Sequence, residues 1–206
     1  MSMMPTTGCD IREYLVEDKQ KEIFENMLEF LQRVLRRNEN ELSSVDICFQ
    51  DKEEFFRSDE EGYGILGEYT HGRYFPCRKA IEICAENLAR FISDFCDSMY
   101  HEGKCQYRPD ACKLYDLVLL HEYMHAYQHL VEHKCLTHEN RSLEEEANRR
   151  AAIVLTAMWN LDEELTRIII GFYKKKSAFG FGDNFSVDGL IAHRMDIDYL
   201  AEKFSS

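Results

Sequence analysis

The sequence lacks the features that mark membrane and conventionally secreted proteins. No apolar run approaches the roughly 20 residues that a membrane-spanning helix needs. The stretch from Met1 to Asp10 has neither the charged nor the apolar region of a secretory signal. There is also no internal repeat and no low-complexity segment. We therefore expect a cytoplasmic protein with no membrane partner, while secretion by a non-classical route, which needs no such signal, stays open.

Positive charge is also scarce. The chain has 25 Lys and Arg against 38 Asp and Glu, a formal net charge of −13. Such a balance argues against binding to a phosphate backbone, and the basic runs at 36–37 and 174–176 are too short to change that. A length of 206 residues with 45% hydrophobic and 31% charged residues fits a single globular domain, 1–206.

Cysteine pairs at metal-binding spacing are absent as well. No Cys-x-x-Cys occurs, and the cysteine spacings match no zinc ribbon. Without a secretory signal, we expect reduced thiols that mostly act as small buried apolar residues, with a bridge or structural metal site as the alternative. The eight cysteines are Cys9, Cys48, Cys77, Cys84, Cys96, Cys105, Cys112 and Cys135.

The most informative motif that is present is HExxH, at residues 121–125. Residues four apart lie on one face of an α-helix, so His121 and His125 can both present a ring nitrogen to one metal ion. Glu122 lies about 100° around the helix, where a general base for a metal-activated water belongs. The motif therefore predicts one catalytic zinc ion.

The segment around this motif indicates a buried helix. Leu114, Leu117 and the apolar run 118–120 project around most of the circumference of a helix expected over 114–130, with Asp110 as its N-cap. Histidines inside such a core would be desolvated at a cost unless something binds them. The alternative is a surface helix with two solvated histidines.

A third ligand is expected on a second helix, residues 143–160. Helical phase turns Glu144 toward the apolar face of this helix, while Glu145 and Glu146 point outward. The outward pair has arginines four residues on, whereas Glu144 has none. Glu144 is thus the predicted ligand. All three glutamates could instead form a solvated acidic helix start, and rival ligands in the connection are His133, Cys135 and His138.

The HExxH motif followed by Glu144-x-Glu146-Ala147-Asn148 resembles the gluzincin metallopeptidases, most closely the ImmA/IrrE-like family. The resemblance covers about 50 residues, 110–160. It implies His121, His125 and Glu144 as zinc ligands and Glu122 as the base. It further implies that Asn148 accepts a hydrogen bond from a ligand histidine, which would fix that ring. The metzincin pattern fails, because Gln128 stands where its glycine would be.

The remaining periodicity predicts an α+β protein: a small zincin-like domain, mostly helical, with a short mixed sheet and a buried HExxH helix. We expect an N-terminal helical part (1–40), a small sheet (45–85) and a helical part with the metal site (86–206). Expected helices cover 11–37, 88–100 (behind the metal helix), 161–175 and 186–204, and expected strands 45–49, 62–69 and 78–84. Residues 102–109 should be a loop and 179–183 a mobile one. By the resemblance, 79–84 or 64–69 would be the edge strand that pairs with substrate.

These features predict a zinc-dependent peptidase acting on a restricted protein or peptide substrate. Glu122 would take a proton from water and pass it to the leaving amine, and a further side chain would stabilise the oxyanion. Candidates for that donor are Tyr173, His193 and Tyr199. Two alternatives stay open: a zinc-binding regulatory or effector protein with little turnover, and a metal-free helical interaction protein. The sequence gives no oligomeric state.

Overall fold

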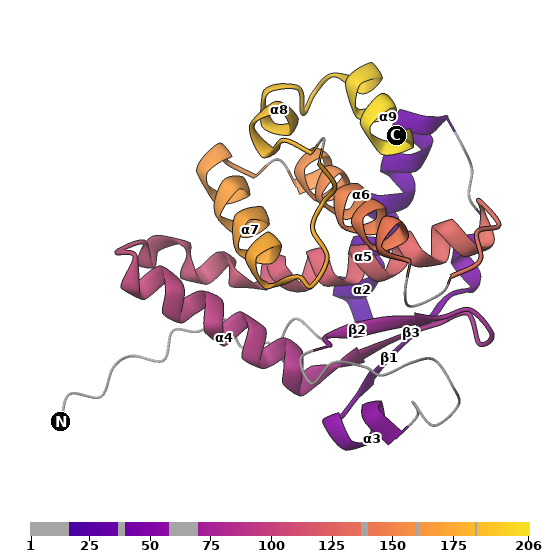
Figure 1. Ribbon diagram of the computed structural model, residues 1–206, viewed down its shortest axis with the longest axis horizontal. Coiled ribbons are helices and arrows are strands. Elements are labelled where there is room, and N and C mark those ends of the chain that lie inside the picture. Colours follow the sequence, from indigo (N-terminus) through magenta and orange to yellow (C-terminus); the bar gives the residue numbers. More distant parts are fainter. Residues whose placement is uncertain (1–16, 37–39, 58–69, 137–139, 160, 184) are drawn as a thin grey trace.

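Helices make up most of the protein, and a small mixed β-sheet accompanies them, which establishes an α+β architecture (Figure 1). The computed structural model describes residues 17–36, 40–57, 70–136, 140–159, 161–183 and 185–206. Within these ranges, no helix is both long and apolar enough to cross a membrane. The α-helices are α2 (Glu17–Phe30), α3 (Lys52–Arg57), α4 (Ala85–His101), α5 (Lys113–Leu130), α6 (Arg141–Trp159), α7 (Glu163–Lys176), α8 (Val187–Ala192) and α9 (Ile197–Ser205). Shorter helical turns are η1 (Leu31–Leu35), η2 (Asn40–Ser44) and η4 (Cys105–Cys112).

The sheet contains β1 (Asp46–Gln50), β2 (Gly72–Phe75) and β3 (Ala80–Cys84) in the order β1-β3-β2. Strand β1 runs parallel to β3, with Asp46 opposite Ala80, and β2 runs antiparallel to β3. Strand β3 therefore lies in the centre, so the expectation that residues 79–84 form the substrate-pairing edge is wrong. Among the described strands the edge next to α5, which carries the HExxH segment, is β2, a strand that the sequence did not predict. The other expected edge, 64–69, lies outside the described residues, as does the strand 62–69.

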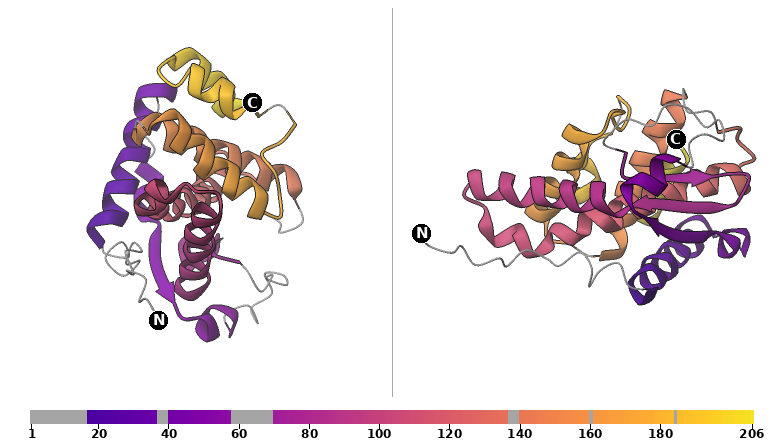
Figure 2. Two further views of the ribbon diagram at one scale, coloured as in Figure 1. Left: turned by 90° about the vertical axis from the view of Figure 1, so that its left-hand side faces the viewer. Right: turned by 90° about the horizontal axis from the view of Figure 1, so that it is seen from below.

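Helix α5 is enclosed on all sides, as its apolar sequence predicts. Every residue from Leu114 to Gln128 is buried. Helix α6 packs along one side of α5 and β2 contacts another, while α2, α4 and α7 cover the remainder (Figure 2). One apolar core joins residues from Ile23 to Phe204. The HExxH segment therefore lies in the middle of the molecule.

Most predicted helices are confirmed within the described residues. Those expected at 88–100, 114–130, 143–160 and 161–175 appear as α4, α5, α6 and α7, and the N-terminal helix appears as α2 with η1. This N-terminal helix ends at Arg36, which has a left-handed φ of 55°. The strand predictions at 45–49 and 78–84 are confirmed as β1 and β3. Helix α3 was not predicted, and the first residues of the N-terminal helix (11–16) lie outside the described ranges.

The start of α5 differs from the prediction. Asp110 is not an N-cap, because η4 runs directly into α5 and the cap position is Cys112, which makes no side-chain cap bond. The backbone N–H of Lys113 instead donates to the carbonyl of Asp110. A preceding turn can thus satisfy N–H groups that a capping carboxylate would otherwise bind. The expected loop 102–109 is consequently helical in its second half.

The C-terminal segment, expected as one helix over 186–204, forms two. Ser186 and Asp196 each begin a helix, since their side chains accept hydrogen bonds from the backbone N–H groups of Gly189 and Tyr199. Such caps end one helical path and start another. The resulting α9 docks on α6, where Arg150 Nε donates to the Phe204 carbonyl at 2.8 Å.

The cysteines have mixed environments. Cys112 is disulfide-bonded, which corrects the expectation of reduced thiols for this residue. Cys84, Cys96 and Cys112 are buried as expected. The expectation of burial is wrong for three exposed cysteines, Cys77, Cys105 and Cys135. Cys48 is a half-buried free thiol, and Cys9 lies outside the described residues.

Candidate metal centre

Helix α5 brings two imidazoles together at the centre of the protein. His121 and His125 are one helical turn apart, and their Nε2 atoms lie 3.0 Å from each other. Each residue is only 9% exposed. Two ring nitrogens this close inside a core require either a shared proton or a shared cation, because two lone pairs would repel each other.

Glu144 on α6 completes a three-residue set. Its carboxylate oxygens lie 3.4 Å from His121 Nε2 and 3.3 Å from His125 Nε2. Two ligands held roughly 2.0–2.1 Å from a tetrahedral zinc ion are about 3.3 Å apart. The three observed spacings agree with that value, so the residues fit a zinc ion. The structure places Glu144 where helical phase predicted it.

Glu122 lies beside this set, as the motif predicts. Ligand-type atoms of His121, Glu122 and His125 all fall within 4.8 Å of one another. The Glu122 carboxylate is buried and accepts a hydrogen bond from the backbone N–H of Tyr74 on β2. Burial raises the pKa of Glu122 and the charge of Glu144 raises it further, whereas the two imidazoles lower it. A carboxylate held in this way is suited to accept a proton.

The electrostatics of the site call for a cation. Burial alone would raise the pKa of Glu144, but hydrogen bonds with His121 and His125 outweigh burial and hold that pKa far below its ordinary value. Burial alone would lower the pKa of His125, but Glu144 raises it to about 9. Within the described residues, neither Glu122 nor Glu144 forms an ion pair with Lys or Arg. A protonated histidine or a metal ion must therefore balance the negative charge of these carboxylates.

Gln128 supports His125 from behind, a role that the sequence analysis missed. Its Oε1 lies 2.9 Å from His125 Nδ1, and its Nε2 donates to the Leu143 carbonyl and to Glu146. Asn148, which the resemblance assigned to such support, makes no hydrogen bond to His121 or His125. Its Nδ2 donates to Ser177 Oγ and to the carbonyls of Phe179 and Gly180.

Those contacts anchor the glycine-rich segment after α7. Asn148 is buried on α6, and the segment buries Phe181, which is 1% exposed. The loop expected at 179–183 is confirmed as a loop, and its mobility stays a prediction. His121 Nδ1 and Asn148 Oδ1 remain buried without a hydrogen-bond partner among the described residues.

The structure separates the three candidate oxyanion donors. Tyr173 on α7 is buried; burial raises its pKa, and Glu122 and Glu144 raise it further, which places the phenol within electrostatic reach of both carboxylates. His193 and Tyr199 stack on each other, 4.5 Å between ring centroids, at the junction of α8 and α9. None of the described contacts of His193 or Tyr199 involves a residue of the candidate metal centre.

His71, just before β2, also borders the site and was not singled out from the sequence. Burial lowers the pKa of His71 to about 4, and His121 lowers it as well, so the ring is neutral at neutral pH. It packs on Phe91 with 4.4 Å between ring centroids. A histidine outside any motif offers no sequence signal, because only the fold brings it to His121.

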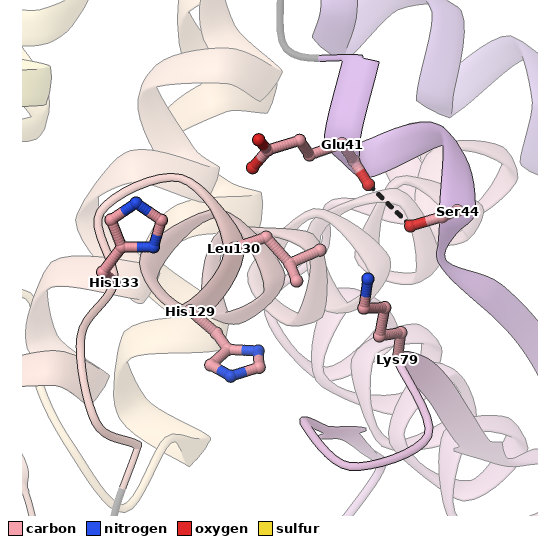
Figure 3. Close-up of a pocket in the computed structure, with 6 residues that line it drawn as sticks. All are labelled: Glu41, Ser44, Lys79, His129, Leu130 and His133. Carbon is pink, nitrogen blue, oxygen red and sulfur yellow. Dashed lines mark hydrogen bonds between the residues drawn. The ribbon is translucent and has the colours of Figure 1, made fainter.

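A cavity of about 480 Å³ lies at the C-terminal end of α5 (Figure 3). Tyr74 connects it to the site, since its backbone bonds Glu122 and its hydroxyl lies 3.1 Å from His129 Nδ1. The rival ligand Cys135 is exposed, His133 lines this cavity instead of the metal site, and His138 lies outside the described residues. The cavity is lined by Glu41, Ser44, Lys79, His129, Leu130 and His133.

In comparisons with known proteins, no family model, no curated protein and no solved structure matches the chain. The likeness of residues 121–148 to gluzincin motifs therefore stays a prediction, and the proposal below depends on the geometry.

Proposed function

We propose that this protein is a zinc-dependent peptidase, with His121, His125 and Glu144 as the ligands of one zinc ion and a zincin-like arrangement around them. The observation that carries the proposal is the meeting of these three side chains, 3.0–3.4 Å apart, without Lys or Arg partners among the described residues. Three protein ligands leave a position open, as in catalytic and unlike closed structural zinc sites. A bound zinc ion would supply Lewis acidity and acidify water.

Glu122 acts as the proton carrier. Burial raises the pKa of its carboxyl group, which favours uptake of a proton from the attacking water and its later delivery to the leaving amine. The Tyr74 N–H holds the carboxylate in place. Tyr173 stays protonated, since burial raises its pKa, and its phenol is the donor for the oxyanion.

The substrate is an extended peptide that pairs with β2. The Cys84 N–H donates to the His71 carbonyl, so at His71 the backbone faces β3. Alternate residues turn their backbone groups to the opposite edge, where the N–H and C=O of Gly72 and the C=O of Tyr74 can pair with substrate while the Tyr74 N–H stays on Glu122. That edge lies beside Glu122, where strand addition would carry a peptide bond past the base.

Zinc analysis combined with a peptide-library cleavage assay tests this proposal. The purified protein should carry close to one zinc, and His121→Ala or His125→Ala should remove most of it. Glu122→Gln should retain zinc and fold but lose hydrolysis, because an amide cannot carry the proton. Glu145→Gln, on the neighbouring helix and paired with exposed Arg141, is the matched control and should cleave normally.

Zinc binding without cleavage of any peptide would reject the peptidase in favour of the regulatory or effector alternative. A stable protein without zinc, active after thorough chelation, would reject the metal site itself.

A further inference from the structure

Gln128 occupies an unusual position for an uncharged polar residue. It lies on the last turns of α5, three residues after His125, and is 0% exposed. A buried amide must satisfy both its donors and its acceptor. Gln128 does so with three groups, one of which is a candidate metal ligand, and this makes it more than a packing residue.

The partners of Gln128 fix which way its amide faces. Its Nε2 lies 3.0 Å from the Leu143 carbonyl and 2.8 Å from Glu146 Oε2. A carbonyl oxygen can only accept, so the NH₂ group must point at α6. The amide oxygen is then the atom that faces His125 Nδ1, at 2.9 Å. The reverse orientation would place two acceptors against each other.

The orientation of the amide in turn determines which nitrogen of the His125 imidazole carries the hydrogen. Because an amide oxygen cannot donate, His125 Nδ1 must carry the hydrogen of that bond. The lone pair of the neutral ring is then on Nε2, the atom that lies 3.0 Å from His121 Nε2. A hydrogen bond to one ring nitrogen decides which nitrogen is available to a metal.

Glu146 gives this arrangement a rigid support. Its carboxylate lies 2.7 Å from Lys134 Nζ and 2.8 Å from Arg150 Nη2. Arg150 is 2% exposed and also binds Glu132, at 2.8 Å. The amide of Gln128 is thus held by a cluster of charges that joins the end of α5, the connection after it and α6.

We propose that Gln128 is a positioning residue for the metal centre, which presents His125 Nε2 to the ion and ties the two ligand-bearing helices together. The Leu143 carbonyl that it binds is adjacent in sequence to Glu144. One side chain therefore fixes the orientation of the His125 ring on α5 and the position of the backbone next to Glu144 on α6. This inference rests on the proposed zinc site but is independent of whether the protein cleaves peptides.

The test compares Gln128→Met with Thr156→Val. Methionine has a similar length and fills the same space without hydrogen bonds, and Thr156 is a buried residue of α6 whose hydroxyl donates to the Ala152 carbonyl. Zinc affinity is measured by competition with a chelator, and thermal stability is measured on the same samples. Gln128→Met should weaken zinc binding about 10- to 100-fold, as loss of outer support does at metal sites. Thr156→Val should bind zinc as the wild type does, even where its melting temperature falls equally.

A second measurement needs no substitution. In zinc-loaded wild-type protein, nitrogen-15 NMR should show His125 coordinated through Nε2, with a slowly exchanging proton on Nδ1. Coordination through Nδ1, or equal zinc affinity of folded Gln128→Met and wild type, would overturn the inference while leaving the zinc site intact. If His125 binds zinc through Nε2 and Gln128→Met weakens that binding, but the protein cleaves no peptide, only the proposed peptidase activity would be overturned.

Discussion

Three consecutive glutamates on α6 have three different surroundings. Glu144 faces the two histidines, Glu145 pairs with exposed Arg141, and Glu146 is enclosed by Lys134 and Arg150. Helical phase predicts the inward turn of Glu144 and the four-residue pairing of Glu146 with Arg150, but it places that pair on the surface, whereas Arg150 is 2% exposed. Glu145 pairs with Arg141 instead of the expected Arg149. Helical phase gives only the direction in which a side chain points. At Glu146 that direction is covered by Lys134 and the end of α5, which the phase of α6 cannot indicate.

Substitution of each glutamate should separate these roles. Glu144→Ala should lower zinc affinity severely, because the ion loses its only anionic protein ligand. Glu145→Ala should change the free energy of unfolding by roughly 0.2–1 kcal/mol, the range of exposed ion pairs. Glu146→Ala should destabilise by about 1–3 kcal/mol, since Arg150 keeps Glu132 while the buried Gln128 amide loses its charged acceptor. Chelator competition and urea unfolding measure the two effects. Normal zinc binding by Glu144→Ala would contradict the ligand assignment.

His71 should make the metal-free protein sensitive to acid. Its pKa of about 4 in the folded protein lies below the ordinary value of 6.5. The folded state therefore binds fewer protons than the unfolded state between these values, and stability falls as pH drops from about 6.5 to 4. The difference between the two pKa values limits the loss in the free energy of unfolding to about 3 kcal/mol.

Comparison of wild type with His71→Gln isolates this contribution from other acid-sensitive groups. Urea unfolding at pH 7.5, 6 and 4.5, with chelator present, should show a smaller decline for His71→Gln. His101→Gln, at the exposed end of α4, is the control and should follow the wild type. An equal decline in all three proteins would refute the assignment to His71.

At the scale of the element, the helices were easier to predict than the sheet edge. The long apolar periods of α4, α5 and α6 indicate helices because burial on those faces dominates local preference. Strand β2 has four residues, begins at Gly72-Arg73 and carries no alternating apolar pattern. Its conformation depends on pairing with β3 and on packing against α5, which no local pattern records. The role of Gln128 also depends on a long-range contact, because its partner Leu143 is 15 residues away, and no local pattern indicates it.

Gly72 should be necessary for the position of Glu122. A Cβ atom at Gly72 would lie 2.8 Å from Ile83 Cδ1 and 3.2 Å from Glu122 Oε1. Gly72→Ala should therefore displace the base or the strand and reduce kcat/KM about 10- to 100-fold, with zinc content unchanged. Gly171→Ala is the matched control, because a Cβ there meets nothing within 4 Å and favours helix α7. Unaltered peptide cleavage by Gly72→Ala would show that this contact does not position Glu122.

At the scale of the whole molecule, the residues of the proposed zinc site come from separate parts of one core. His121 and His125 are on α5, Glu144 on α6, and the Tyr74 N–H that holds Glu122 on β2. The sequence predicts the α+β class and the pairing of α5 with α6, because apolar periods and the motif spacing are local. The arrangement of β2, α7 and α9 around them depends on long-range packing. Occupation of the site should therefore report on folding of the entire core.

Zinc should stabilise the whole protein. A ligand that binds only the folded state at about 100 times its Kd adds about 2.7 kcal/mol to the free energy of unfolding. For a chain of 206 residues this corresponds to a rise in Tm of about 5–10 °C. Calorimetry of chelator-treated and zinc-loaded samples measures the rise. Glu122→Gln should retain it and His125→Ala should lose it, because only the latter removes a ligand. A Tm that zinc leaves unchanged, in protein shown to be metal-free beforehand, would mean that the two histidines and Glu144 hold no ion.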